Sequence, residues 1–155
     1  MAITSAICST FKKELMTATH NFTTTSGNTF KVALIKANAS QTGTYSAATT
    51  SYTTITGNSD ELANGSGYTT GGNTLTNVTP TNGTSTTTTA LTDFADTSWT
   101  SATFTTRGCV IYNDTASGDP AVMVIDFGAD YSVAGGTFTI QFPTADESNA
   151  ILRIT

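Results

Sequence analysis

Hydrophobic residues near the start of the chain recur at intervals of three and four positions. The series consists of Ile3, Ile7, Phe11, Leu15, Ala18 and Phe22. This spacing places the side chains on one face of an α-helix, and the charged residues 12–14 fall between them. The pattern predicts an amphipathic N-terminal helix or arm over residues 1–22, capped by Thr4 or Ser5.

From residue 28 onward the hydrophobic period changes to two, which is the period of a β-strand. The strand signals lie at residues 28–36, 99–112, 121–127, 137–142 and 151–154. Gly135 and Gly136 predict a turn between the third and fourth of these runs. Short strands that recur about every ten residues predict an antiparallel β-sandwich or barrel-like domain.

Residues 37–89 are rich in Thr, Gly and Asn, and glycines interrupt them repeatedly. Two interpretations are open: a flexible low-complexity spacer, or long loops joined by short strands such as residues 73–79. Tyrosines and leucines within the segment favour the second, because a pure linker lacks side chains that can pack. The sequence thus predicts one β-sandwich domain over residues 23–155, with long loops at about 37–89.

Composition supports a mainly β fold. Threonine accounts for 37 of the 155 residues, whereas charged residues make up only 11%. Threonine is β-branched and favours strands, and an average soluble protein has about 25% charged residues. The length fits one domain with its own hydrophobic core.

Charge and hydropathy exclude two classes of partner. The chain has six Lys and Arg residues and a net charge of -5, which argues against binding to nucleic-acid phosphates. No run approaches the roughly 20 apolar residues of a membrane span, and the first residues do not resemble a secretory signal. We therefore expect a soluble protein that is made in a cytoplasm.

Few residues offer catalytic chemistry. His20 is the single histidine, and at the end of the predicted helix it is expected to face solvent or the last carbonyls. Cys8 and Cys109 lack metal-binding spacing and are expected to be buried as small apolar residues. The sequence therefore predicts no enzymatic activity and no cofactor.

Four aspartates form two close pairs, Asp93 with Asp96 and Asp126 with Asp130. Paired carboxylates can bind calcium or cleave sugars, although no calcium-binding loop accompanies them here. Asp at strand ends commonly accepts hydrogen bonds from turn amides, so the four are only weak metal candidates. Arg107 is predicted to form a structural ion pair with Asp93, Asp96 or Asp126.

Seven short motifs follow one another along the chain. They are His20-Asn-Phe22, Thr29-Phe-Lys-Val-Ala-Leu-Ile35, Gly67-Tyr-Thr-Thr-Gly-Gly72, Asp93-Phe-Ala-Asp-Thr-Ser-Trp99, Arg107-Gly-Cys-Val-Ile-Tyr112, Asp126-Phe-Gly128 and Thr139-Ile-Gln-Phe142. In this order the chain, from about residue 5 to its end, resembles a group of small virion proteins of tailed bacteriophages. Each motif alone is unspecific, and the resemblance rests on their order.

The resemblance implies a non-enzymatic part of the virion. We expect a capsid decoration (cement) protein that binds the outer surface of the major capsid protein lattice and stabilises the mature head. Such a protein is made in the host bacterial cytoplasm, is located on the capsid surface, and is favoured to be a homotrimer at local threefold positions. The alternative is a tail, baseplate or fibre component that acts as a receptor- or glycan-binding module.

This hypothesis identifies contact residues on the predicted helix and in the long loops. They are Phe11, Leu15, Tyr45, Tyr52 and Tyr68. In the alternative, the exposed loop tyrosines and Trp99 form a platform for a sugar or a receptor. Trp99 is interpreted instead as a core anchor of the sandwich, because large aromatic side chains are mostly buried.

Overall fold

The computed structural model describes residues 3–85 and 88–155, so residues 1–2 of the predicted helix and 86–87 of the predicted loop lie outside it. Its elements are β1 (Ala6–Ile7), α1 (Ser9–Met16), β2 (Phe30–Lys36), the 3-10 helix η1 (Asn38–Ser40), α2 (Thr53–Gly57), β3 (Asn73–Thr74), β4 (Asn77–Asn82), β5 (Ala90–Phe94), β6 (Thr97–Asn113), β7 (Ala121–Ile140) and β8 (Leu152–Ile154). The chain is mainly β with one helix near its N-terminus, which confirms the predicted fold class.

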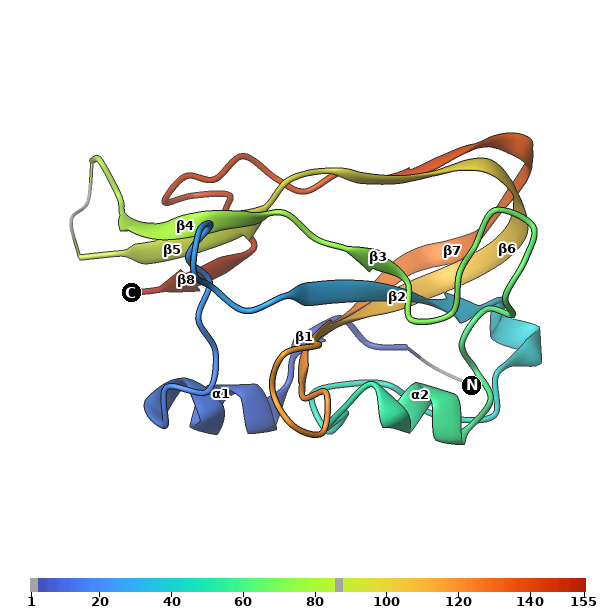
Figure 1. The fold of residues 1–155 in the computed structure, drawn as a ribbon, viewed down its shortest axis with the longest axis horizontal. Helices are drawn as coiled ribbons and strands as arrows, with labels where there is room; N and C mark the ends of the chain where they lie inside the picture. Colours follow the sequence, from blue (N-terminus) through green and yellow to red (C-terminus); the bar gives the residue numbers. More distant parts are fainter. Residues whose placement is uncertain (1–2, 86–87) are drawn as a thin grey trace.

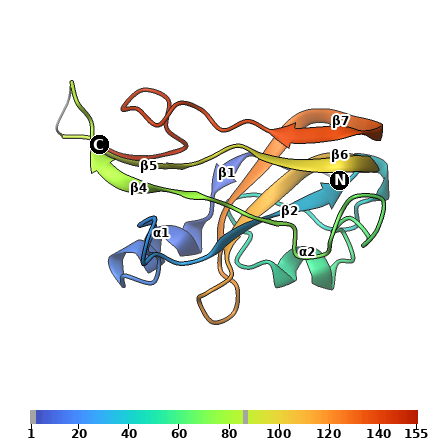
Figure 2. The same cartoon turned by 45° about the horizontal axis from the view of Figure 1, so that its top comes forward.

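The strands form two antiparallel sheets. The larger sheet has the order β1-β7-β6-β2-β3, and the smaller has the order β4-β5-β8. Both helices lie below the larger sheet, and the smaller sheet lies at the end of the molecule above α1 (Figure 1). The tilted view shows β4 and β5 on the side of α1, away from α2 (Figure 2).

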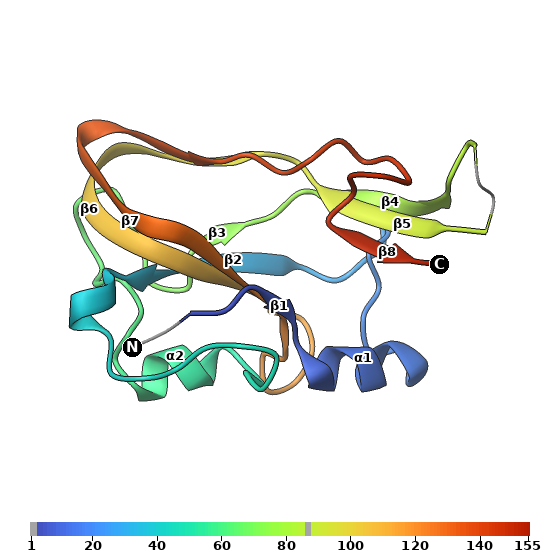
Figure 3. The same ribbon diagram turned by 180° about the vertical axis from the view of Figure 1, so that it is seen from behind.

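The β6–β7 hairpin is bent back on itself and contributes to two layers (Figures 1 and 3). Its strands have 17 and 20 residues and pair from Thr97 opposite Ile140 to Tyr112 opposite Ala121. Between the two limbs, Arg107 alone lies opposite residues 127–130. Extra residues on one strand of a pair bend that strand, so this bulge accounts for the fold-back.

The predicted turn at Gly135 and Gly136 is wrong, because residues 121–127 and 137–142 do not form separate strands. They belong almost entirely to the single strand β7. The backbone φ is positive at Gly135 (65°) and at Ser101 (52°), and the register of the β6–β7 pairing shifts beside both residues. The two glycines therefore mark a bulge within a continuous strand. Glycine is typical of both turns and bulges, so the sequence alone does not distinguish them.

The predicted helix over residues 1–22 is too long, since α1 covers only Ser9–Met16. Ile3 pairs with Tyr45, and β1 pairs with β7, so sheet pairing replaces the helix before residue 8. The predicted caps are also wrong. Cys8 occupies the N-cap position, and the Ser5 hydroxyl accepts a hydrogen bond from the Asp126 backbone N–H (2.9 Å).

The long segment 37–89 packs against the core in its described part. Its apolar side chains Tyr45, Ile55, Leu62, Tyr68 and Leu75 all belong to the buried cluster. Short helices and strands, including α2, β3 and β4, lie between the loops. The packed-loop interpretation is therefore confirmed for these residues, and the aromatic and aliphatic side chains explain it.

Candidate functional site

Two buried carboxylates, those of Asp60 and Glu61, hold the long loops in place through hydrogen bonds. Asp60 is fully buried, and its carboxylate accepts hydrogen bonds from the Tyr45 hydroxyl and from the backbone N–H groups of Thr42 and Gly43. Burial by itself raises the pKa of Asp60, but these hydrogen bonds outweigh it, and the pKa lies below its ordinary value. The carboxylate therefore stays charged and joins the loop at residues 42–45 to the end of α2.

Glu61 performs the same role for a second set of partners. It accepts hydrogen bonds from the hydroxyls of Tyr52 (2.6 Å) and Tyr68 (2.7 Å) and from the backbone N–H of Gly71 (2.6 Å). Burial and the neighbouring Glu61 raise the pKa of Tyr68 well above its ordinary value. Both carboxylates are satisfied by neutral donors, which is the arrangement of a structural network.

His20 does not face solvent, so that sequence prediction is wrong. Its Nε2 lies 2.9 Å from the Glu14 carboxylate and its Nδ1 lies 3.0 Å from the Asn113 side-chain nitrogen. The Asn113 oxygen accepts the N–H groups of Thr115 and Ala116, so its NH₂ group faces the ring. Nδ1 must then accept and Nε2 must donate, which defines a neutral histidine that holds α1 against the end of β6.

Arg107 secures the bend of the β6–β7 hairpin. Its Nε donates to Asp126 at 2.7 Å, and its guanidinium lies 4.0 Å from Asp130. Asp126 directly precedes the residues 127–130 that bulge opposite Arg107, and Asp130 is the last of them. The guanidinium of Arg107 lowers the pKa of Asp126. The predicted structural ion pair is confirmed, with Asp126 as the partner.

The aspartates proposed as weak metal candidates are used as hydrogen-bond acceptors. Buried Asp93 accepts the N–H groups of Phe94 and Ile151, and Asp96 accepts the N–H of Phe142. Burial raises the pKa of Asp93 despite its backbone donors. Within residues 3–85 and 88–155, no group of three or more His, Cys, Asp or Glu side chains is arranged to hold a metal ion.

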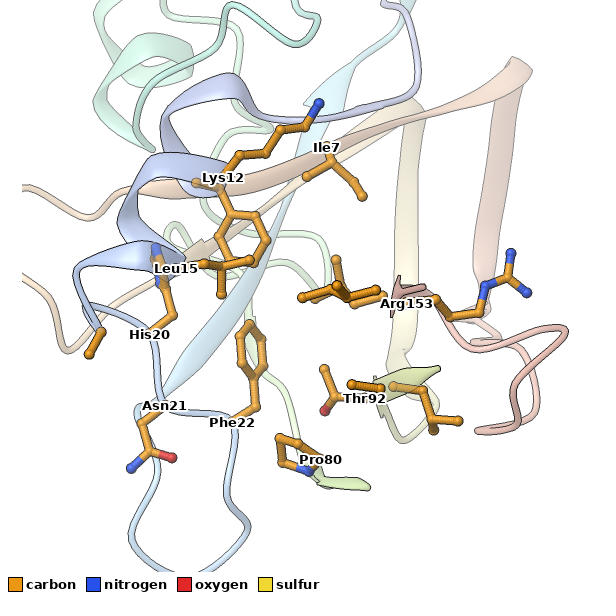
Figure 4. A pocket seen from close by; sticks show the side chains of 15 residues that line it. Ile7, Lys12, Leu15, His20, Asn21, Phe22, Pro80, Thr92 and Arg153 are labelled. Carbon is orange, nitrogen blue, oxygen red and sulfur yellow. The ribbon is translucent and has the colours of Figure 1, made fainter. Parts of the chain in front are cut away.

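One candidate site is a groove of about 610 Å³ between α1 and the smaller sheet, which we call the apolar groove. Its floor and walls are formed mainly by Ile7, Phe11, Leu15, Phe22, Leu91, Leu152 and Ile154. Helix α1 supplies one wall and strands β5 and β8 supply the other. In Figure 4, Leu15 and Phe22 lie across the groove from Thr92 and Arg153.

Two cationic side chains, Lys12 from α1 and Arg153 from β8, line the apolar groove. Their charged ends point away from its apolar centre (Figure 4). In the part of the chain that the structure describes, neither forms a salt bridge, whereas Lys31 and Arg107 do. Hydrogen bonds lower the pKa of Asp146, and Arg153 nevertheless lies near enough to that carboxyl to lower it further. The groove thus combines an apolar lining with a positively charged rim, on a chain whose net charge is -5.

A second depression of about 370 Å³, the aromatic hollow, lies on β7 and the segment that follows it. Phe127, Tyr131, Phe138 and Phe142 line it. Tyr131 is 51% exposed, and together with Met16 and Ile154 it belongs to the few large apolar side chains that are exposed among the described residues. Exposed apolar patches of this kind are typical of protein contact surfaces.

The sequence-predicted contact residues are mostly inside the molecule. Phe11, Tyr45 and Tyr68 are buried, and Leu15 and Tyr52 are half-buried against the core. An exposed platform of loop tyrosines is therefore not present, because these rings fill the core and bind Asp60 and Glu61. Phe11 and Leu15 nevertheless line the apolar groove.

Trp99 lies in the core cluster with 3% of its surface exposed, and it packs beside Tyr68 and Phe138.

Sequence reasoning did not identify Lys12, Arg153 or Ile154 as site residues. The run at residues 151–154 predicts a strand, but no sequence signal indicates that this strand faces α1.

Comparisons with known proteins add no relative. No family model matches the chain, and neither a search of curated proteins nor a search of solved structures finds a match. None of the helices within residues 3–85 and 88–155 is long and apolar enough to cross a membrane.

Proposed function

We propose that this chain is a non-enzymatic structural protein of a bacteriophage virion that decorates the outer surface of the capsid. The order of the seven sequence motifs supports a virion protein. The apolar groove is the structural observation that carries a binding role, because it offers an apolar surface with a charged rim.

Binding only to the mature shell would stabilise that shell by mass action. The acceptor in this proposal is the lattice of the major capsid protein. Three copies around a local threefold axis form a homotrimer in this arrangement. Analytical ultracentrifugation of the purified protein tests the oligomer independently of the capsid.

The alternative, a receptor- or glycan-binding component of the tail, baseplate or fibre, has less support. It relied on exposed aromatic side chains, and Tyr45, Tyr68 and Trp99 are buried. Sugar binding normally requires aromatic faces that are open to the ligand. The aromatic hollow, with its exposed Tyr131, is one place where such a face is open.

The decisive experiment is to image purified virions and to quantify the copies of this chain per particle. Hundreds of copies ordered on the shell lattice are expected for decoration. A few copies at the tail would favour the alternative, and absence from the particle would overturn both. Shell stability with and without the protein, measured by heating purified capsids, then tests the stabilising role.

A further inference from the structure

We propose that the apolar groove and the free edge of β8 together bind an extended segment of a partner protein in which apolar residues alternate with acidic ones. The inference rests on the proposed function only in taking the partner to be a structural protein. It specifies how the contact is made and which chemistry recognises it.

The first observation is an open strand edge beside the groove. Strand β8 ends the order β4-β5-β8, so one of its edges has no neighbouring strand within residues 3–85 and 88–155. Ile154 on this strand is 63% exposed. The opposite edge, β4, contains Pro80, which lacks a backbone N–H and is typical of an edge that does not pair. An added strand therefore finds its backbone partners along β8.

The second observation is the lining. Leu152 and Ile154 alternate along β8 and both line the groove, opposite Phe11 and Leu15 of α1. In an extended chain every second side chain points to the same face. A strand placed beside β8 therefore directs alternate residues into the groove, where apolar side chains fit, and the others toward its rim.

The third observation is the charge of the rim. Lys12 and Arg153 line the groove and form no salt bridge in the described chain, although acidic residues outnumber basic ones by eleven to six. Arg153 lies near enough to Asp146 to contribute to the lowered pKa of that carboxyl, so a bound carboxylate would compete with Asp146 for Arg153. Carboxylates on the bound segment would face these two cations. A fatty acid would also match the apolar lining and the positive rim. It has no backbone N–H and C=O groups to pair with β8, so the peptide satisfies one more feature of the site.

The test measures binding of fluorescent peptides of about six residues, a typical strand length, to the full chain by fluorescence anisotropy. The probe alternates valine with aspartate, and its control alternates valine with lysine. We expect the acidic peptide to bind and the basic one not to bind. Equal binding of both peptides, or binding of neither, would overturn the proposal.

Charge recognition is tested by the double variant Lys12→Glu/Arg153→Glu. Its affinity for the acidic peptide should fall by about fivefold or more at low salt, and by less at high salt. Lys12→Glu alone is also compared with Lys13→Glu, which matches it as a single charge reversal, because Lys13 belongs to the same helix, is exposed, and does not line the groove. Equal losses in these two single variants would contradict a specific role of the rim.

Strand pairing is tested with two further peptides, each N-methylated at alternate residues so that one of its edges cannot donate hydrogen bonds. One of the two should lose binding and the other should retain it. If both bind as the parent does, no strand is added to β8. If dodecanoate binds and the peptides do not, the groove is a lipid site. Particle copy number is measured separately, so a failed peptide leaves the decoration proposal intact.

Discussion

At the scale of single residues, the buried carboxylates carry the clearest consequences. Asp60 has a pKa below its ordinary value in the folded chain, so the folded state binds its proton less readily than the unfolded state does. Its contribution to stability is therefore present above the ordinary value of 3.8 and is lost as the pH falls through the lower folded value.

Asp60→Asn tests this contribution. The amide would present an NH₂ group to the donors from Thr42 and Gly43, and we expect a loss of about 1–3 kcal/mol in the free energy of unfolding at pH 7. The difference from the wild type should shrink below pH 3.8. Urea unfolding at several pH values measures it, and a difference that stays constant down to pH 2 would contradict the assignment.

Trp99 provides a second prediction at this scale. Trp99→Ala should cost about 3–5 kcal/mol, because it opens a cavity beside Tyr68 and Phe138. The indole N–H has no hydrogen-bond partner among the described residues, so Trp99→Phe should retain much of the stability. Chemical denaturation compares the two. A well-folded Trp99→Ala chain of unchanged stability would show that the ring is not a core anchor.

At the scale of elements, the loop that contains Gly67 approaches β6 closely. Gly67 has a φ of +86°, and a Cβ there would lie 2.8 Å from Ala102 Cα and from Ser101 O. Gly65 also has a positive φ but faces open space. Gly67→Ala should therefore be less stable than Gly65→Ala by about 1–3 kcal/mol, measured by urea unfolding. Equal stabilities would mean that the loop can move away from β6.

The ion pair of Arg107 is predicted to hold the two limbs of that hairpin. Arg107→Gln should lower the thermal midpoint and increase amide hydrogen exchange at residues 127–130, because it removes the contacts to Asp126 and Asp130. Exchange at residues 30–32 of β2, which pair with residues 111–113 of β6 away from the bend, should change little. Arg153→Gln, at an arginine without an ion pair, is the matched control. Unchanged exchange at the bend would exclude a clamping role.

At the scale of the whole molecule, periodicity predicted the mainly β fold, strands β2, β6 and β8, and the position of the helix. It overestimated the helix because Ile3 and Ile7 fit a helical spacing but pair with other segments of the chain. The burial of His20 and the meeting of α1 with β8 depend on contacts between residues far apart in sequence, which no local pattern contains. The groove rim was missed for the same reason.

The alkylation rates of the two buried cysteines report how often the folded chain opens around each of them. Burial and the nearby Glu14 raise the pKa of Cys8 to about 12, and burial raises the pKa of Cys109 further still. Only the thiolate reacts with alkylating reagents, so both thiols are inert until the chain opens. Cys8 begins α1 and Cys109 lies within β6. The two alkylation rates, resolved by mass spectrometry, therefore report separately how often the N-terminal helix detaches and how often the central strands part.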